Sequence, residues 1–110
     1  MFRYGQLNRE MDRLGFAEST CGTHYIRAAV EIAAGLDRAM MCKHIYPELA
    51  QRYKSTPAAI EHAIRTAIEK ATRSPNWEFA WRDLGGWGRP TNSEVIMRLL
   101  RECSDCEPNF

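Results

Sequence analysis

Two prolines ten residues apart, Pro47 and Pro57, constrain the fold of this chain more than any other feature. Proline is accepted at the first position of a helix, where its fixed φ suits the helix and its missing N–H is no loss. Each proline therefore predicts a helix start, and Thr56 can accept a hydrogen bond as the N-cap of the second helix. A helix of about seven residues, a turn of three or four and a longer helix have the spacing of a helix-turn-helix, here over residues 46–73.

The apolar residues of this segment support the same pair of helices. Leu49 and Tyr53 of the first predicted helix are placed to meet Ile60 and Ile64 of the second. Helical spacing also defines a buried stripe along the second helix, made of Ile60, Ala63, Ile64, Ala67, Ile68 and Ala71. One face of the second helix is therefore expected to pack on the domain, with the opposite face left to solvent or to a ligand.

That opposite face carries residue types that can read DNA. Arginine can bond guanine O6 and N7 together, histidine and threonine can bond base edges, and glutamate can accept from cytosine N4. Residues 43–73 hold six basic side chains against three acidic ones, a net charge of +3 in a chain whose total is +1. The candidate DNA-contacting residues are Arg52, Lys54, Ser55, Thr56, Ala58, Ala59, Glu61, His62, Arg65, Thr66, Glu69, Lys70 and Arg73. The helix pair alone does not separate DNA binding from an ordinary solvated helix face.

Helical periodicity continues before residue 46. Helices are expected at about 6–14, 25–35 and 36–45, with a turn near 20–23. Gly15 stands where a glycine commonly ends a helix, directly after the first of these segments.

Two more helices are predicted in the last third of the chain. Trp77 and Trp81 lie one helical turn apart, which indicates a helix that packs two indoles on the domain and stops at the glycine pair 85–86. Thr91 and Glu94 form a capping-box pattern that begins the last helix. No stretch alternates β-branched and polar residues, so the expected fold class is all-α, a single compact bundle of about six helices containing a helix-turn-helix.

Length and composition limit the function classes. A chain of 110 residues is enough for one compact domain and too short for a multidomain enzyme. Hydrophobic residues at 45% and charged residues at 26% are typical of globular chains, which excludes a disordered tail or a collagen-like sequence. The N-terminus has charges where a signal peptide needs an apolar core, so a cytoplasmic protein is expected.

The four cysteines do not form a recognisable site. Cys103 and Cys106 make a lone CxxC near the C-terminus, and Cys21 and Cys42 would join them only if the fold brought them there. Reduced thiols without metal or cofactor are expected, and Cys103 and Cys106 are expected to be dispensable for structure. A small thiol or zinc enzyme is the least favoured function class, and the chain is not expected to be an enzyme.

The order of several motifs resembles a known family, the C-terminal DNA-binding effector domain of stage 0 sporulation protein A, the response regulator that initiates sporulation. The anchors are GTHYIRAAV at 22–30, IYPELA at 45–50 with Tyr53, AIRTAIE at 63–69 and, most specific, PTNSE at 90–94. The resemblance spans about residues 11–102. It implies a six-helix domain that binds short promoter elements in double-stranded DNA and activates or represses transcription.

The resemblance also assigns the DNA-reading helix to residues 57–73. Glu61 and Arg65 match the family pattern. His62 and Thr66 differ from it, because the pattern that this chain resembles has arginine and histidine at these two positions. Ala58 and Ala59 replace a polar pair of the family. The resemblance places the base- and phosphate-facing positions at Ala58, Ala59, Glu61, His62, Arg65 and Thr66. A mostly neutral histidine ring does not replace a guanidinium fork, so the preferred DNA element is expected to differ from the family's usual one.

The family resemblance implies partners as well. Homodimers on tandem DNA sites are expected, with RNA polymerase or a full-length regulator as further partners, and the Trp77–Trp81 helix is the candidate contact if one indole is exposed. The family's phosphorylatable receiver domain has no counterpart in residues 1–110, so phosphorylation is not expected to switch this chain directly. The alternative function is a protein-interaction module that keeps the fold and pairs with a full-length regulator.

Overall fold

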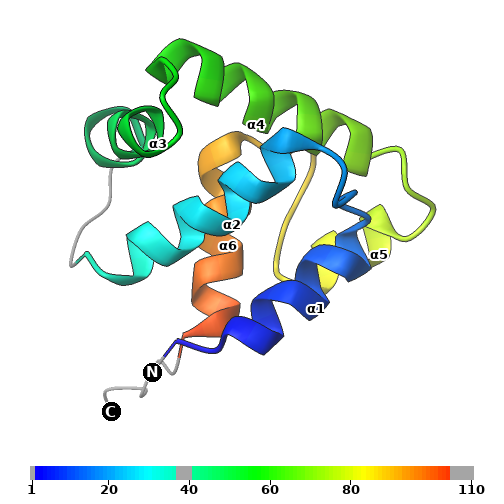
Figure 1. Ribbon diagram of the computed structural model, residues 1–110. Coiled ribbons are helices and arrows are strands. Elements are labelled where there is room, and N and C mark those ends of the chain that lie inside the picture. Colours follow the sequence, from blue (N-terminus) through cyan, green and yellow to red (C-terminus); the bar gives the residue numbers. More distant parts are fainter. Residues whose placement is uncertain (1, 37–40, 105–110) are drawn as a thin grey trace.

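The computed structural model describes residues 2–36 and 41–104, and in that part of the chain it contains six α-helices and one π-helical turn (Figure 1). The helices are α1 (Tyr4–Leu14), α2 (Cys21–Ala34), α3 (Tyr46–Arg52), α4 (Pro57–Ala71), α5 (Trp77–Asp83) and α6 (Asn92–Cys103). The π-helical turn, Met41–Ile45, leads directly into α3. The expected all-α bundle of about six helices is confirmed.

The helix boundaries follow the local signals in most places. The first helix ends at Gly15 as expected, because this residue adopts a left-handed φ of 92° and its N–H bonds to the carbonyl of Met11 at 3.2 Å. The predicted turn at 20–23 is wrong, because α2 already begins at Cys21. Of the helix expected at 36–45, residues 37–40 lie outside the described part and Met41–Ile45 are π-helical instead of α-helical.

The early start of α2 has a packing reason. Gly22 and Thr23 are buried in its first turn, where α2 crosses α4. A β-carbon on Gly22 would overlap the backbone carbonyl of Ala63 and the methyl group of Ala67, so only glycine lets the two helices approach this closely. This long-range contact cannot be seen in the local pattern, which explains why the turn was misplaced.

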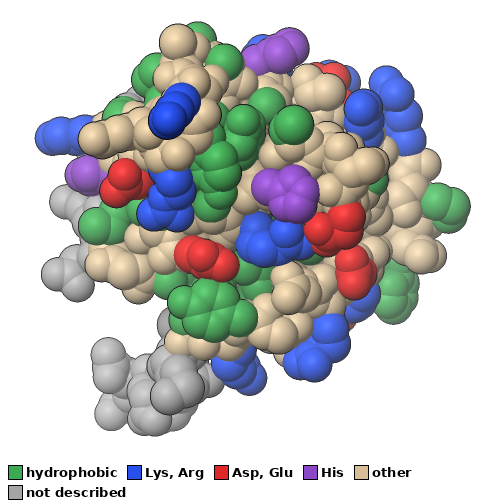
Figure 2. Space-filling view, in the orientation of Figure 1, with side chains coloured by type: hydrophobic (Ala, Val, Ile, Leu, Met, Phe, Trp, Pro, Cys, Tyr) green, Lys and Arg blue, Asp and Glu red, His purple; other side chains and the backbone are tan. Residues whose placement is uncertain are grey.

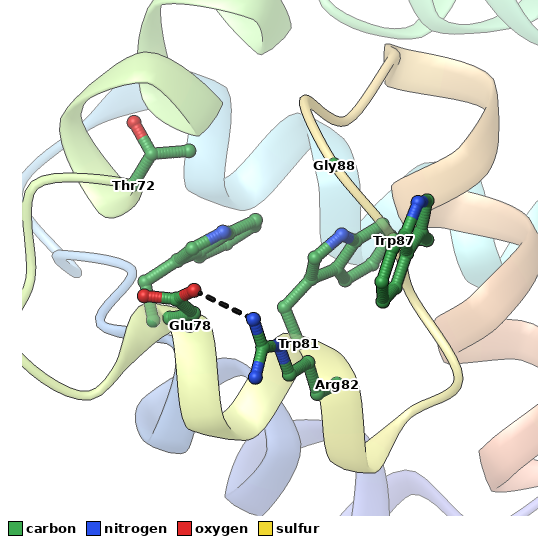
Figure 3. A pocket seen from close by; sticks show the side chains of 7 residues that line it. Thr72, Glu78, Trp81, Arg82, Trp87 and Gly88 are labelled. Atoms are coloured by element: carbon green, nitrogen blue, oxygen red, sulfur yellow. Dashed lines mark hydrogen bonds and ion pairs between the residues drawn. The ribbon is translucent and has the colours of Figure 1, made fainter.

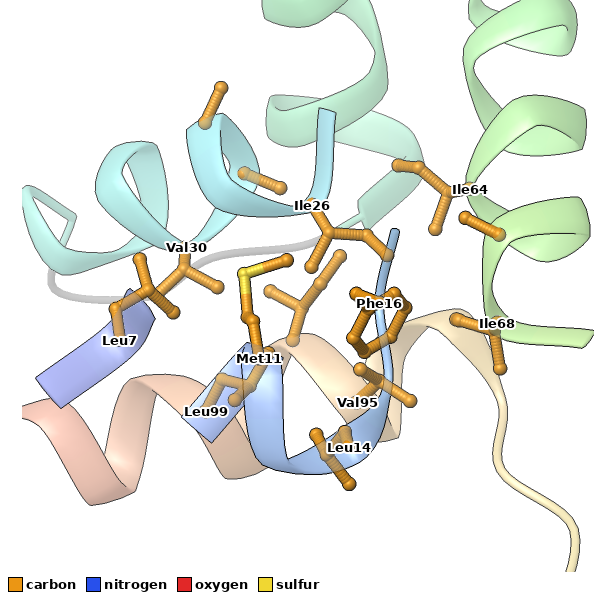
Figure 4. Packing of buried hydrophobic residues seen from close by; sticks show 14 of the residues in the cluster. Leu7, Met11, Leu14, Phe16, Ile26, Val30, Ile64, Ile68, Val95 and Leu99 are labelled. Atoms are coloured by element: carbon orange, nitrogen blue, oxygen red, sulfur yellow. The ribbon is translucent and has the colours of Figure 1, made fainter. Parts of the chain in front are cut away.

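The hydrophobic core lies between α1, α2, α4 and α6 (Figure 4). Leu14, Ile26, Val95 and Leu99 come from three of these helices and have no solvent-exposed surface. Phe16, in the turn after α1, packs edge-on against Trp77 with ring centroids 6.1 Å apart, and this contact joins α5 to the core. These contacts join α1, α2, α4, α5 and α6. Helix α3 is attached chiefly through its contacts with α4.

The two ends of the described chain are tied together. Phe2 and Ser104 form an isolated antiparallel bridge, and the backbone N–H of Arg3 donates to the carbonyl of Cys103 at 2.7 Å. Cys103 is fully buried, and its burial argues against the expectation that it is dispensable for structure; Cys106 lies outside the described residues. Burial, with the nearby charges of Glu10 and Glu102, raises the pKa of the Cys103 thiol to about 11.

The contact at Gly22 predicts a difference between two glycines in equivalent positions. Gly5 and Gly22 are each the second residue of a helix, but a β-carbon on Gly5 meets no atom within 4 Å. We expect Gly22→Ala to lower the free energy of unfolding by about 1–3 kcal/mol through overpacking, and Gly5→Ala to raise it by about 0.5 kcal/mol. Urea denaturation of the two variants measures both changes, and equal effects would contradict the assigned crossing.

The raised pKa of Cys103 predicts a loss of stability at high pH. The folded protein holds the thiol proton up to about pH 11, whereas the thiol of an unfolded chain titrates near 9.0. The free energy of unfolding should therefore fall as the pH rises from about 9 to 11. Cys103→Ser should lose about 1–3 kcal/mol at neutral pH by burying a hydroxyl, and should lose this part of the pH dependence.

The exposed Cys21 supplies the control for this measurement. Denaturation midpoints of Cys21→Ser should follow the wild-type pH curve. A curve for Cys103→Ser that also matches the wild type would show that the buried thiol is not the titrating group.

Candidate nucleic-acid interface

The helix-turn-helix forms as the sequence predicts. Helices α3 and α4 lie at one edge of the molecule, joined by the turn 53–56 (Figure 1). Pro47 and Pro57 each occupy the start of their helix, and the hydroxyl of Thr56 accepts a hydrogen bond from the backbone N–H of Ala59 at 3.1 Å. Because the cap satisfies a backbone donor that would otherwise lack a partner, the start of α4 is fixed locally.

The turn contains the one non-glycine residue with a positive φ among the described residues. Lys54 has a φ of 53°, a left-handed conformation that costs a side chain such as lysine free energy. The backbone N–H of Ser55 closes the turn by donating to the carbonyl of Ala50 at 2.8 Å, the hydrogen-bond pattern of a Schellman motif. Glycine is the usual residue at this position of such a motif. Lys54 therefore stands at a position where the backbone conformation is unfavourable for a residue with a β-carbon.

The inner face of the pair agrees with the sequence prediction except at one aromatic residue. Leu49, Ile60 and Ile64 have no exposed surface. Tyr53 is 42% exposed and packs on Tyr25 of α2, with ring centroids 5.0 Å apart, instead of on α4. The reason is that α3 ends at Arg52, so helical spacing no longer sets the direction of the Tyr53 side chain.

The outer face of α4 is exposed along its length. Arg65 lies at its centre, with Nη1 3.3 Å from Oε1 of Glu61 and Nη2 3.2 Å from Nδ1 of His62. The Arg65 side chain is 52% exposed, and an exposed ion pair one helical turn apart contributes little free energy. Arg65 can therefore exchange Glu61 for another acceptor at small cost, which is the behaviour that contact with a base edge requires.

The other predicted residues differ in exposure. Exposed ones are Arg52, Lys54, Ser55, Thr56, Ala58, Ala59, His62, Glu69 and Lys70; Glu61 and Thr66 are half-buried. Arg73 is exposed but lies two residues beyond the end of α4, so the predicted helix limit of 73 is too long. On the face drawn in Figure 2, basic and acidic side chains are interspersed, so this face carries no single broad region of one charge sign.

The sequence analysis missed a residue that holds the helix-turn-helix in place. The side-chain amide of Asn92, the first residue of α6, donates to the hydroxyl of Tyr46 at 3.0 Å and to the backbone carbonyl of Glu61 at 3.2 Å. One amide group therefore links the start of α6 to both α3 and α4. The PTNSE sequence marked this position, but only the fold shows what Asn92 contacts.

The capping box that precedes this contact is confirmed. The hydroxyl of Thr91 accepts from the N–H of Glu94 at 3.1 Å, and the carboxylate of Glu94 accepts from the N–H of Thr91 at 3.3 Å. These two hydrogen bonds fix where α6 begins. They also fix the position of Asn92 relative to α4.

The predicted Trp77–Trp81 contact surface is wrong. The two indoles stack with centroids 5.5 Å apart and are 6% and 2% exposed, so neither is available to a second copy through its ring. They form the floor of a hollow whose outer wall is Trp87, which is 80% exposed (Figure 3). The exposed aromatic residue of α5 itself is Phe79, on the face away from the core.

Other candidate chemistry is not assembled in the described ranges 2–36 and 41–104. No group of three or more His, Cys, Asp or Glu side chains there is arranged to hold a metal ion. Cys21 is exposed at the start of α2, far from Cys103 in the fold, and both are free thiols; the Cys42 side chain and Cys106 are not described. Within the same ranges, no helix is long and apolar enough to cross a membrane.

One comparison with known proteins matches this arrangement. The model of a protein family described as "Sporulation initiation factor Spo0A C terminal" matches residues 7–103. The match covers every α-helix after the first three residues of α1, including the helix-turn-helix and the PTNSE sequence.

Proposed function

We propose that this chain, which belongs to the family of Spo0A C-terminal domains, recognises a specific sequence of double-stranded DNA through the outer face of α4. The family is the DNA-binding effector part of a sporulation response regulator, and it acts in transcription regulation. The observation that carries the proposal is the exposed Arg65, which contacts only exposed or half-buried neighbours, Glu61 and His62, on a helix whose opposite face is buried.

The residues of α4 divide by their chemistry. Arg65 has the two parallel donors that suit guanine, and His62 beside it can donate or accept one hydrogen bond at a neighbouring base. Ala58 and Ala59 present only methyl groups at the start of the helix, which allows a close approach to the groove floor and contact with thymine methyl groups.

The residues before α4 suit the DNA backbone. Arg52 at the end of α3 and Lys54 in the turn are exposed cations beside the helix start. Contacts of this kind position a protein on the duplex without reading sequence. The strained backbone at Lys54 supports a role for its charge, because glycine would fit the turn better.

The function proposed here predicts a change of sequence preference on removal of Arg65. Arg65→Ala should weaken binding to the preferred duplex by about 1–3 kcal/mol and relax the preference at one base pair. Arg82→Ala is the matched control, because Arg82 of α5 forms the same i,i+4 ion pair, with Glu78 at 3.0 Å. Selection from random duplexes, followed by anisotropy titrations, measures both effects; an unchanged preference in Arg65→Ala would refute base reading by this residue.

Replacing Lys54 with glycine is expected to stabilise the fold and to weaken DNA binding. Lys54→Gly should raise the free energy of unfolding by about 1 kcal/mol, because glycine adopts a φ of 53° without strain. The same change should weaken binding to all duplexes by a similar factor. Lys54→Ala removes the charge but keeps the strain, so it should bind as weakly as Lys54→Gly without the gain in stability. Binding of Lys54→Gly equal to wild type would remove Lys54 from the interface.

A further inference from the structure

A hollow lies beside the C-terminal half of α4. It has a volume of about 420 Å³ and lies between the C-terminal half of α4 and the segment that leads into α6. Arg65, Glu69 and Arg73 line it from the side of α4, and Arg89 and Asn92 line it from the other side. The hollow thus begins at the central residue of the DNA-facing surface and extends away from the helix-turn-helix turn.

Two of these cations have no side-chain partner in the part of the chain that the structure describes. Among the described residues, the guanidinium groups of Arg73 and Arg89 make no ion pair or hydrogen bond, whereas Arg13, Arg27 and Arg82 each pair with a carboxylate. Two positive groups that line one hollow repel each other weakly in water, and an anion between them removes that repulsion. The hollow is therefore suited to a group with negative charge and several acceptor oxygens.

The backbone holds Arg89 close to this position. Pro90 follows it directly and restricts its backbone to extended conformations, and the capping box at Thr91 begins α6 one residue later. Asn92 is then bonded to the carbonyl of Glu61, on α4 itself. Arg89 is therefore only three residues from Asn92, which bonds to α4. The position of Arg89 along the chain is thus tied to the position of α4.

We propose that Arg73 and Arg89 clamp a backbone phosphate of the DNA strand that borders the groove occupied by α4. The proposal rests on the proposed function. An α-helix with its side chains is about as wide as the major groove, roughly 12 Å, so both flanks of a helix in the groove lie next to a strand. The hollow lies along one flank of α4, at its C-terminal half. Arg52 and Lys54 lie near the N-terminal end of the same helix.

Glu69 favours a DNA phosphate over a free anion. Its carboxylate lines the same hollow and, within the described residues, forms no ion pair, so it repels any anion that enters. A small free anion gains only the contacts inside the hollow. A phosphate of a bound duplex is held there by the other contacts of α4 as well, which gives it a high effective concentration.

The test measures binding, at several salt concentrations, to the preferred duplex from the selection described above and to a second duplex of unrelated sequence. Arg89→Gln and Arg73→Gln should each lower the slope of log affinity against log salt by about 0.9, as expected for one lost phosphate contact. The loss of affinity between 50 and 200 mM salt should then be smaller by about 3.5-fold than for wild type, equally on both duplexes. Glu69→Gln should bind both duplexes more tightly than wild type.

The control is Arg101→Gln, which makes the same change of charge on an exposed residue near the far end of α6. It should keep the wild-type slope. A slope for Arg89→Gln equal to that of Arg101→Gln, with Arg65→Ala still altering sequence preference, overturns the clamp and leaves the proposed function standing. A loss confined to one duplex would make Arg89 a base-reading residue and would also overturn it. If wild type binds neither duplex, the proposed function fails and the clamp with it.

A second measurement distinguishes binding of a DNA phosphate from binding of free inorganic phosphate. The melting temperature of the protein without DNA should be the same in inorganic phosphate and in chloride at equal ionic strength and pH. A higher melting temperature in phosphate that disappears in Arg89→Gln would assign the hollow to a free anion and overturn the DNA clamp.

Discussion

The position of α4, the helix proposed to read DNA, depends on the contact between Gly22 and the backbone of this helix. Because residue 22 has no β-carbon, α2 lies directly on the carbonyl of Ala63 and the methyl group of Ala67. Farther along α2, Ile26 and Val30 enter the core shared with α1 and α6. The inner side of α4 is thus fixed by backbone-level packing, and the side chains of its outer face contact one another without entering the core.

A second, polar constraint sets how α3, α4 and α6 sit together. The amide of Asn92 bonds to the hydroxyl of Tyr46 and the carbonyl of Glu61, and the capping box at Thr91 fixes that amide in space. The apolar crossing and this polar link act on different sides of α4. Together they connect the residues proposed to face DNA bases with the start of α6, which is the pre-organisation that a reading helix needs if it is to bind without rearrangement.

The sequence predicts the parts of this structure that local chemistry decides. The starts of α3, α4 and α6 follow from proline and cap positions, and the exposed face of α4 follows from helical spacing. The parts that depend on distant residues were missed or misplaced: the start of α2 at the Gly22 crossing, the burial of Cys103 and the ring of Tyr53 on Tyr25. Asn92 and Arg89 belong to the same group, because their partners or neighbours lie more than fifteen residues away along the chain.

The bridge between Phe2 and Ser104 gives the fold a mechanical direction. Figure 1 shows the start of α1 and the end of α6 side by side, on the side of the molecule away from α4. A pull on the two ends of the described chain would therefore act first on this bridge and on the contact between α1 and α6, and only through them on the crossing of α2 and α4.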